Sequence, residues 1–195
     1  MTSHRILKAK LVSALQTAAA TGPAEAPDDD VIAFLEELDG FVHQIDNAVD
    51  LHSMGGLETV VQFIRDSSRS VAVRAQAAVV VGASASNNPQ ATENALKVGA
   101  LHALVVDLWP AAESHPGNAL KRVLFATAAL LRQSSEGFQQ FAKLDGYVES
   151  APRSTPLDVL LGTDGSHPRG MEPFPLFLNT PPPTKQPLLV GGGWG

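Results

Sequence analysis

Apolar residues recur at intervals of three and four along most of the first 148 positions, which is the spacing of one helix face. The clearest stripe runs from Ile32 to Ile45. It follows Asp28, Asp29 and Asp30, carboxylates that suit the positively polarised start of a helix. Aromatic residues make up only 6% of the chain, and the Ala and Leu that dominate the apolar positions are strong helix formers. Besides the helix carrying this stripe, helices are predicted at 57–64, 71–85, 101–109, 119–133 and 137–144.

A short motif centred on glycine occurs three times, in steps of 44 and 46 residues. Glycine tolerates a positive φ, so it can end one helix and let the next leave at a steep angle. The Ala-rich helices at 71–85 and 119–133 allow neighbours to approach closely, and such units must stack because one alone cannot cover its apolar face. We predict an all-α, armadillo/HEAT-like α-solenoid of about two and a half three-helix repeats. The three copies of the motif are Met54-Gly55-Gly56-Leu57, Val98-Gly99-Ala100-Leu101 and Leu144-Asp145-Gly146-Tyr147.

Changes in composition divide the chain into four parts. Residues 1–20 are expected to form a solvent-facing N-terminal helix, amphipathic through Leu7, Leu11 and Leu15, and 21–27 a linker containing Pro and Gly. The repeats occupy 28–148, with Pro89 opening a helix and 110–117 forming a break. Residues 149–195 hold nine of the 14 Pro and seven of the 16 Gly, which predicts a disordered tail.

The net charge of −6 is unevenly distributed, because ten carboxylates and no Lys or Arg lie between Glu25 and Glu58. An acidic chain repels phosphate backbones, which argues against a nucleic-acid partner. The acidic stretch is either a solvated face or an attraction for a basic surface on a protein partner. No run approaches the roughly 20 apolar residues of a membrane helix, and no secretory signal follows Met1.

No arrangement of residues predicts a catalytic, cofactor or metal site, so the chain is not expected to be an enzyme. The six His lack ligand spacing, Cys is absent, and no G-x-S-x-G occurs. The glycine-containing stretch 162–166 lacks the Lys of a phosphate-binding loop. Asp46, Asn47 and Asp50 lie on one helix turn, where either capping or a family-specific role would explain them.

The string VHQIDNAVDL at 42–51, running into Gly55-Gly56-Leu57, resembles the opening repeat of the armadillo-type nucleotide-exchange factors that serve the heat-shock 70-kDa chaperones. Further matches lie at 77–83, 86–89, 99–101, 121–125 and 140–144, so the resemblance covers about 28–148. The sequence resembles the endoplasmic-reticulum branch, which acts on the chaperone BiP, more than the cytosolic branch. This likeness implies a monomeric, cofactor-free co-chaperone that clasps the chaperone's ATPase domain, opens its nucleotide cleft and promotes ADP release.

In armadillo stacks the third, long helix of each unit lines the concave side, so the resemblance also implies which residues contact the partner. Arg and aromatic side chains are the types that dominate interface energetics. The positions expected to bind the partner are Arg74, Gln76, Val79 and Ala83 on the first long helix, and Arg122, Phe125, Ala129 and Gln133 on the second.

Two departures from the family leave alternatives open. Family members continue with further repeats after position 148, so the chain is interpreted as C-terminally truncated and an inactive isoform stays possible. The family branch implies the endoplasmic-reticulum lumen, whereas a chain used as written without a signal peptide would stay cytoplasmic. A generic armadillo adaptor that binds an extended peptide is the other alternative. Its grooves carry Asn and Trp ladders, and the matching places here hold Ala83, Ala129, Val79 and Phe125.

Overall fold

The structure is a computed structural model that describes residues 2–132 and 134–148, so Gln133 and the tail predicted at 149–195 lie outside the described residues. Within those ranges every regular element is a helix, which confirms the predicted all-α fold. The elements are α1 (Thr2–Thr21), α2 (Asp28–Val42), α3 (Ile45–Ser53), α4 (Gly56–Arg65), α5 (Val71–Ala85), α6 (Pro89–Lys97), α7 (Ala100–His102), the π-helical η1 (Ala103–Leu108), α8 (Trp109–Glu113), α9 (Ala119–Leu131) and α10 (Ser135–Val148).

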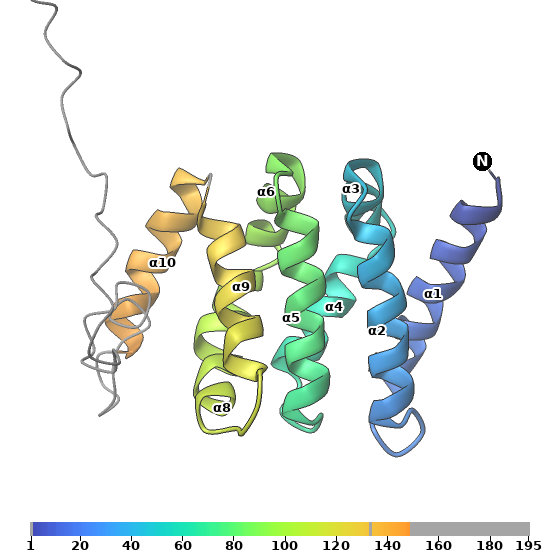
Figure 1. Ribbon diagram of the computed structural model, residues 1–195, viewed down its shortest axis with the longest axis horizontal. Coiled ribbons are helices and arrows are strands. Elements are labelled where there is room, and N and C mark those ends of the chain that lie inside the picture. Colours follow the sequence, from blue (N-terminus) through green and yellow to red (C-terminus); the bar gives the residue numbers. More distant parts are fainter. Residues whose placement is uncertain (1, 133, 149–195) are drawn as a thin grey trace, which may run out of the picture.

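The long helices α2, α5 and α9 lie side by side in one row, with α5 packed against both of the others (Figure 1). The shorter helices form a second layer. There α4 packs on α5, and η1 and α8 pack on α9. This two-layer stack is an armadillo-like solenoid, as the sequence predicts. The number of repeats, about two and a half, stays a prediction.

Glycines at equivalent places form the joints between the short helices. Gly55 precedes α4 with φ 71°, and Gly99 precedes α7 with φ 78°, so both adopt the left-handed conformation expected of them. The third expected joint is not formed, because α10 continues to Val148 without a break. The position that matches Gly55 and Gly99 is Asp145, which lacks the conformational freedom of glycine.

A polar side chain from an earlier helix fastens each of these two joints. Gln16 of α1 donates from Nε2 to the Met54 carbonyl at 3.3 Å. Arg65 of α4 donates from Nη2 to the carbonyls of Val98 and Gly99, at 3.4 and 3.1 Å. α1 thus relates to α4 as α4 relates to α7, and it belongs to the stack rather than lying free in solvent.

One face of α1 is buried, as its amphipathic pattern requires. Leu11 and Leu15 are 5% and 0% exposed and face α2 and α4, whereas Leu7 is 43% exposed. Residues 22–27 join α1 to α2, one residue fewer than the predicted linker, and include Gly22 with φ 78°.

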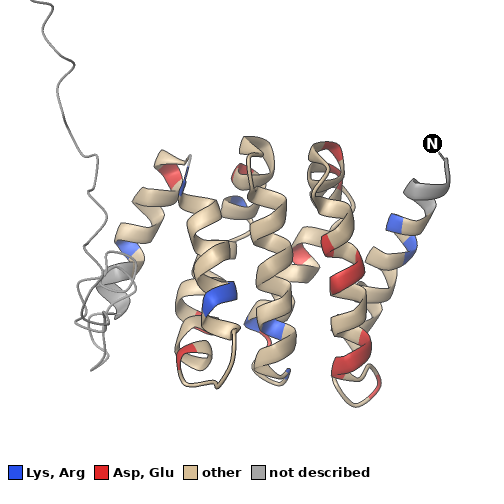
Figure 2. Ribbon diagram, viewed as in Figure 1, with Lys and Arg blue, Asp and Glu red and all other residues tan. Residues whose placement is uncertain are grey.

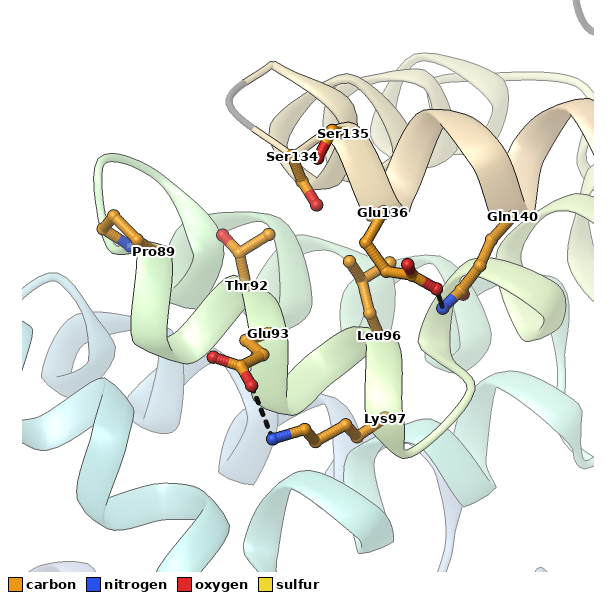
Figure 3. Close-up of a pocket in the computed structure, with 9 residues that line it drawn as sticks. All are labelled: Pro89, Thr92, Glu93, Leu96, Lys97, Ser134, Ser135, Glu136 and Gln140. Atoms are coloured by element: carbon orange, nitrogen blue, oxygen red, sulfur yellow. Dashed lines mark hydrogen bonds and ion pairs between the residues drawn. The ribbon is translucent and has the colours of Figure 1, made fainter.

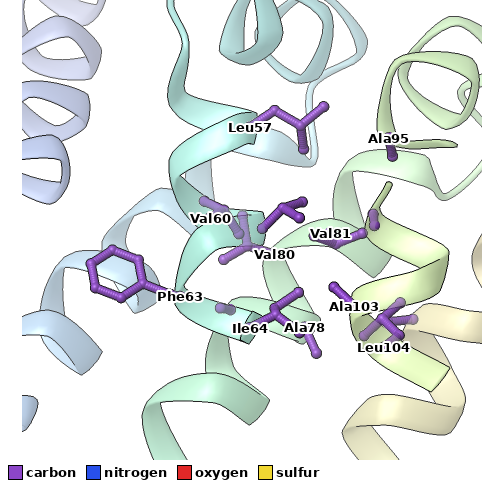
Figure 4. Close-up of a cluster of buried hydrophobic side chains, with 14 of the residues drawn as sticks. Leu57, Val60, Phe63, Ile64, Ala78, Val80, Val81, Ala95, Ala103 and Leu104 are labelled. Atoms are coloured by element: carbon purple, nitrogen blue, oxygen red, sulfur yellow. The ribbon is translucent and has the colours of Figure 1, made fainter. Parts of the chain in front are cut away.

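The core lies between the two layers and is centred on α4 and α5. Leu57, Val60 and Ile64 of α4 lie beside the small side chains of α5, whereas Phe63 points the other way, toward the N-terminal helices (Figure 4). Of the 15 residues of α5, 12 are buried, so this helix has protein on nearly every side. Its Ala and Gly content is what makes room for neighbours on both sides.

Two helix boundaries differ from those predicted. α2 ends at Val42 and Ile45 begins α3, where its side chain is 63% exposed, so Ile45 does not continue the apolar stripe. The break predicted at 110–117 starts later, because Pro110 lies in the first turn of α8. The π-helical η1 runs directly into this turn, so the helical run from Ala100 to Glu113 includes Pro110.

Arg69 lies between α4 and α5 and connects these two helices to α1 and α2. Its fully buried side chain donates to the Ala18 carbonyl at 2.8 Å, to the Ala26 carbonyl and to Asp28 Oδ1 at 3.1 Å, and it covers the Phe63 ring. Asp28 Oδ2 also accepts from the Ser70 N–H at 3.0 Å. Arg69, paired with Asp28, therefore holds the chain on both sides of the predicted linker.

Replacing Asp28 by Asn tests this connection. Burial raises the pKa of Asp28, but the hydrogen bonds from Ser70 and the Arg69 charge outweigh it and leave the pKa below the ordinary 3.8. The carboxylate therefore stabilises the fold above pH 3.8, and this contribution is lost as the pH falls through the lowered pKa. We expect Asp28→Asn to reduce the free energy of unfolding by about 1–3 kcal/mol at pH 7 in urea denaturation. The difference should shrink below pH 3.8.

Asp29→Asn is the matched control, because Asp29 is the exposed neighbour and forms no ion pair among the described residues. Equal stability losses in the two variants would contradict a specific role for Asp28.

Candidate functional site

The row of long helices presents one continuous surface, which we call the α2–α5–α9 face and define by Asp39, Gln76, Val79, Arg122 and Phe125. Contacts and charges link these residues across three helices. α2 carries six carboxylates and no Lys or Arg, whereas α9 carries Lys121 and Arg122 and no carboxylate. Acidic positions consequently mark one side of the row and basic positions the other (Figure 2).

Arg122 is held in a fixed orientation by its neighbour on α5. Its Nη1 donates to Gln76 Oε1 at 2.7 Å, and Gln76 itself is only 4% exposed. A guanidinium has five N–H donors, and the remaining ones form no hydrogen bond within the described part of the chain. The half-buried Arg122 thus has one donor committed to the fold and others available to a partner.

Asp39 faces the same surface from α2. Burial raises the pKa of Asp39 above its ordinary value, and so does the charge of Glu36, while the charges of His43 and Arg122 oppose the rise. His43 Nε2 lies 3.7 Å from Asp39 Oδ1. The carboxyl group therefore contributes to the field around Arg122 without forming a direct pair with it.

Phe125 places an aromatic ring on the α9 side of this surface, 44% exposed. It lies over Gly82 of α5: a Cβ built on Gly82 would come within 2.6 Å of the Phe125 ring and 2.9 Å of the Ala126 Cα. The absence of a side chain at position 82 allows both the ring and the α9 backbone to lie this close. Val79, one turn earlier on α5, is half-buried.

The other predicted contact positions fall into different environments. Arg74 is 5% exposed, and its Nε and Nη2 donate to the carbonyls of Ile64 and Asp107 at 2.9 and 2.6 Å. Arg74 therefore joins α4 and η1 in the interior, and the fold does not present it to a partner. Ala83 and Ala129 are 5% and 8% exposed, which leaves them little contact surface.

A hollow of about 450 Å³ lies between α6 and α10 (Figure 3). Its charged side chains have partners within their own helices: Lys97 pairs with Glu93 at 2.6 Å, and Glu136 accepts a hydrogen bond from Gln140 at 3.0 Å. Ser134 Oγ accepts from the Gly137 N–H, and no His lines this hollow. These residues do not form a nucleophile–base pair.

No group of His, Asp and Glu within the described ranges could hold a metal ion. Likewise, no single helix among those residues has both the length and the apolar content to cross a membrane. Only α6 taken together with 100–113, across a 73° bend, meets those criteria.

A family profile described as the SIL1/FES1/HPBP1 C-terminal domain matches residues 47–149, more than half of the chain. The chain belongs to this family. It is 42% identical over 118 residues to the mouse and rat proteins named nucleotide exchange factor SIL1, and 32% identical over 115 residues to the protein of that name from Xenopus laevis. These matches cover about 60% of this chain and 24% of each relative, so the chain spans about a quarter of their length.

Membership of the SIL1/FES1/HPBP1 family confirms the resemblance deduced from the 42–51 string, including its likeness to the endoplasmic-reticulum branch that SIL1 represents. Nucleotide exchange factors are non-catalytic co-chaperones. This agrees with the prediction that the chain is not an enzyme.

The structure explains part of the family-like string at 42–51. Asn47 donates from Nδ2 to the Phe41 carbonyl at 2.9 Å, and its Oδ1 accepts from Lys8 Nζ at 2.7 Å. Asp50 pairs with the same ammonium at 3.1 Å. Asn47 and Asp50 thus connect α3 to α2 and α1, and neither caps the start of α3, where no side chain forms a cap bond.

α2 is the part of the face that sequence reasoning missed. A signal was present, since α2 and α5 begin at Asp28 and Val71, 27 and 28 residues before Gly55 and Gly99. This shared spacing makes α2 the equivalent of α5. The acidic side chains of α2 therefore belong to the same surface as Arg122.

The contact between α5 and α9 can be tested at Gly82. An added methyl group there would meet the Phe125 ring and the α9 backbone, so we expect Gly82→Ala to lower the free energy of unfolding by about 1–3 kcal/mol in urea denaturation. Gly40→Ala is the control, because a Cβ at this α2 position meets nothing within 4 Å. It should raise stability by about 0.5–1 kcal/mol through helix propensity. Stabilisation by both substitutions would show that α5 and α9 are not closely packed.

Proposed function

We propose that this chain is an adenyl-nucleotide exchange factor that binds the ATPase domain of a heat-shock 70-kDa chaperone, BiP or a close homologue, through the α2–α5–α9 face and promotes ADP release. The observation that carries the proposal is the 42% identity to nucleotide exchange factor SIL1. The exposed surface within the matched region supports it, because Arg122 and Phe125 are residue types that concentrate binding energy at interfaces.

The face also suits the task physically. An exchange factor releases ADP only if it binds the open chaperone more tightly than the ADP-bound one, so that factor and nucleotide oppose each other through linkage. A stiff surface enforces such a preference better than a compliant one. The α2–α5–α9 face is stiff because α5 is buried between its two neighbours.

We further propose that the chain acts as a monomer in the endoplasmic-reticulum lumen. The location follows the SIL1 homologues, which are endoplasmic-reticulum proteins. Size-exclusion chromatography with light scattering would test the monomeric state.

A generic armadillo adaptor is the weaker alternative. Along α5 and α9 the positions that would carry a peptide-binding ladder are Val79, Ala83, Phe125 and Ala129. Two of these are nearly buried alanines, which offer an extended peptide no side-chain hydrogen bonds.

Release of labelled ADP from purified BiP, with and without the 195-residue chain, tests the proposal directly. We expect the chain to accelerate release from BiP more than from a cytosolic homologue, because the sequence is 42% identical to nucleotide exchange factor SIL1 over 118 residues. An unchanged rate with both chaperones, together with undetectable binding, would overturn the proposed function.

A pair of exposed phenylalanines tests the location of the binding surface. Phe125 lies on the α2–α5–α9 face and Phe138 on α10, 44% and 58% exposed. We expect Phe125→Ala to weaken chaperone binding by about 1–3 kcal/mol in calorimetric titration, since aromatic anchors contribute energies of this size. Phe138→Ala should bind like the unmodified chain. The reverse order would move the site to α10.

A further inference from the structure

An open hollow lies at the end of the α2–α5–α9 face, where α5 and α9 both begin. Its volume is about 250 Å³, below the range of pockets that hold drug-sized ligands but sufficient for a single side chain. We call it the Arg122 notch. Its lining comprises Ala72 and Ala75 of α5, Ala119 and Arg122 of α9, and His115, Pro116 and Asn118 of the connecting loop.

The notch is built to admit a side chain at close range. Its floor consists of Ala72 and Ala75 from the first turns of α5 and Ala119 from the first residue of α9. These small residues leave the polar groups of Arg122, His115 and Asn118 as the functional part of the wall. None of the lining residues is acidic.

The charge in the notch favours an anion. The guanidinium of Arg122 uses Nη1 for Gln76, which leaves the Nε and Nη2 edge free for the two oxygens of a carboxylate. Asp39 of α2 interacts with the Arg122 charge but does not line the notch. The exposed His115 and Asn118 add further hydrogen-bonding groups to the lining.

The notch is also preorganised. Gln76 is 4% exposed and holds the guanidinium at 2.7 Å, so little side-chain freedom remains to be lost when a partner binds. Asn118 precedes α9 but forms no side-chain cap bond, so its amide is available as well.

We propose that the Arg122 notch receives the carboxylate of an Asp or Glu side chain on the partner protein, with Arg122 as the binding group and Gln76 as the residue that positions it. This inference rests on the proposed function, because the partner is the chaperone's ATPase domain. It adds which chemical group of the partner is bound, and where. Together with the acidic side chains of α2, the notch also determines the orientation of the partner on the α2–α5–α9 face.

Substitutions in the full 195-residue chain separate this role from general charge. Arg122→Gln removes the charge but keeps a polar side chain, and Arg122→Lys keeps the charge but loses the two-pronged geometry. Lys121→Gln is the matched control, since Lys121 is exposed on the same helix and does not line the notch. His115→Ala removes a lining side chain of the notch that lies in the exposed loop between α8 and α9, outside the core.

We expect Arg122→Gln to weaken binding to BiP about tenfold or more and to flatten its dependence on salt concentration. Arg122→Lys and His115→Ala should give smaller losses, and Lys121→Gln should change the affinity less than about twofold. Calorimetric titrations at two salt concentrations measure these effects. Thermal melting shows whether each variant is folded, and His115→Ala keeps the test open if the Arg122 variants unfold.

A charge exchange identifies the partner group. The chain with Arg122→Glu is tested against BiP variants in which surface Asp and Glu residues are changed singly to Lys. Recovery of binding by one such variant supports the notch, and no recovery in the complete set contradicts it.

The outcomes also distinguish the two proposals. If Arg122→Gln binds and releases ADP as well as Lys121→Gln does, the notch is overturned while the exchange function stands. If the unmodified chain binds no chaperone, both proposals fail.

Discussion

The close approach of α2 and α9 to the two sides of α5 is the constraint on which the rest of the structure depends. With 12 of its 15 residues buried, α5 carries mostly Ala, Gly, Ser and Val, and its buried Arg74 and Gln76 both form hydrogen bonds to neighbouring helices. At Gly82 even a methyl group would collide with α9. Gln76 reaches Arg122 because of this short separation, so the packing behind the surface determines the geometry of the groups on it.

Arginine serves two opposite purposes in this fold. Arg69 and Arg74 are buried and donate to backbone carbonyls, and Arg69 also pairs with Asp28, which is why the interior tolerates their charge. Arg122 instead forms one hydrogen bond within the described part of the chain, to the Gln76 side chain, and its other donors lie at the surface. The sequence could not separate the two uses, because Arg74 and Arg122 both lie in the first turns of long helices.

The architecture could be predicted where the sequence repeats itself. The spacing of Gly55 and Gly99 and the composition of Val71–Ala85 were sufficient to identify the stack, because conformation and packing at those places depend on local residue type. The site was harder to predict. Whether a residue on α5 points toward the face or the core depends on where α4, η1 and α9 pack, and these contacts join residues 10 to 46 positions apart. Position on a long helix therefore did not separate Phe125, whose side chain is exposed, from Arg74, whose side chain is buried.

The charge pattern across the row limits how a partner can be oriented on it. A protein surface that satisfied Arg122 with a carboxylate would need neutral or basic groups opposite Glu36 and Asp39, since like charges held together near a surface cost free energy. Turned end for end, the same partner would bring acid to α2 and base to α9, and both contacts would be repulsive. The small-residue core keeps the two charged sides at a fixed separation, so one orientation is favoured. A rigid face that accepts its partner in one orientation can favour one arrangement of that partner's lobes, which is the differential affinity that nucleotide exchange requires.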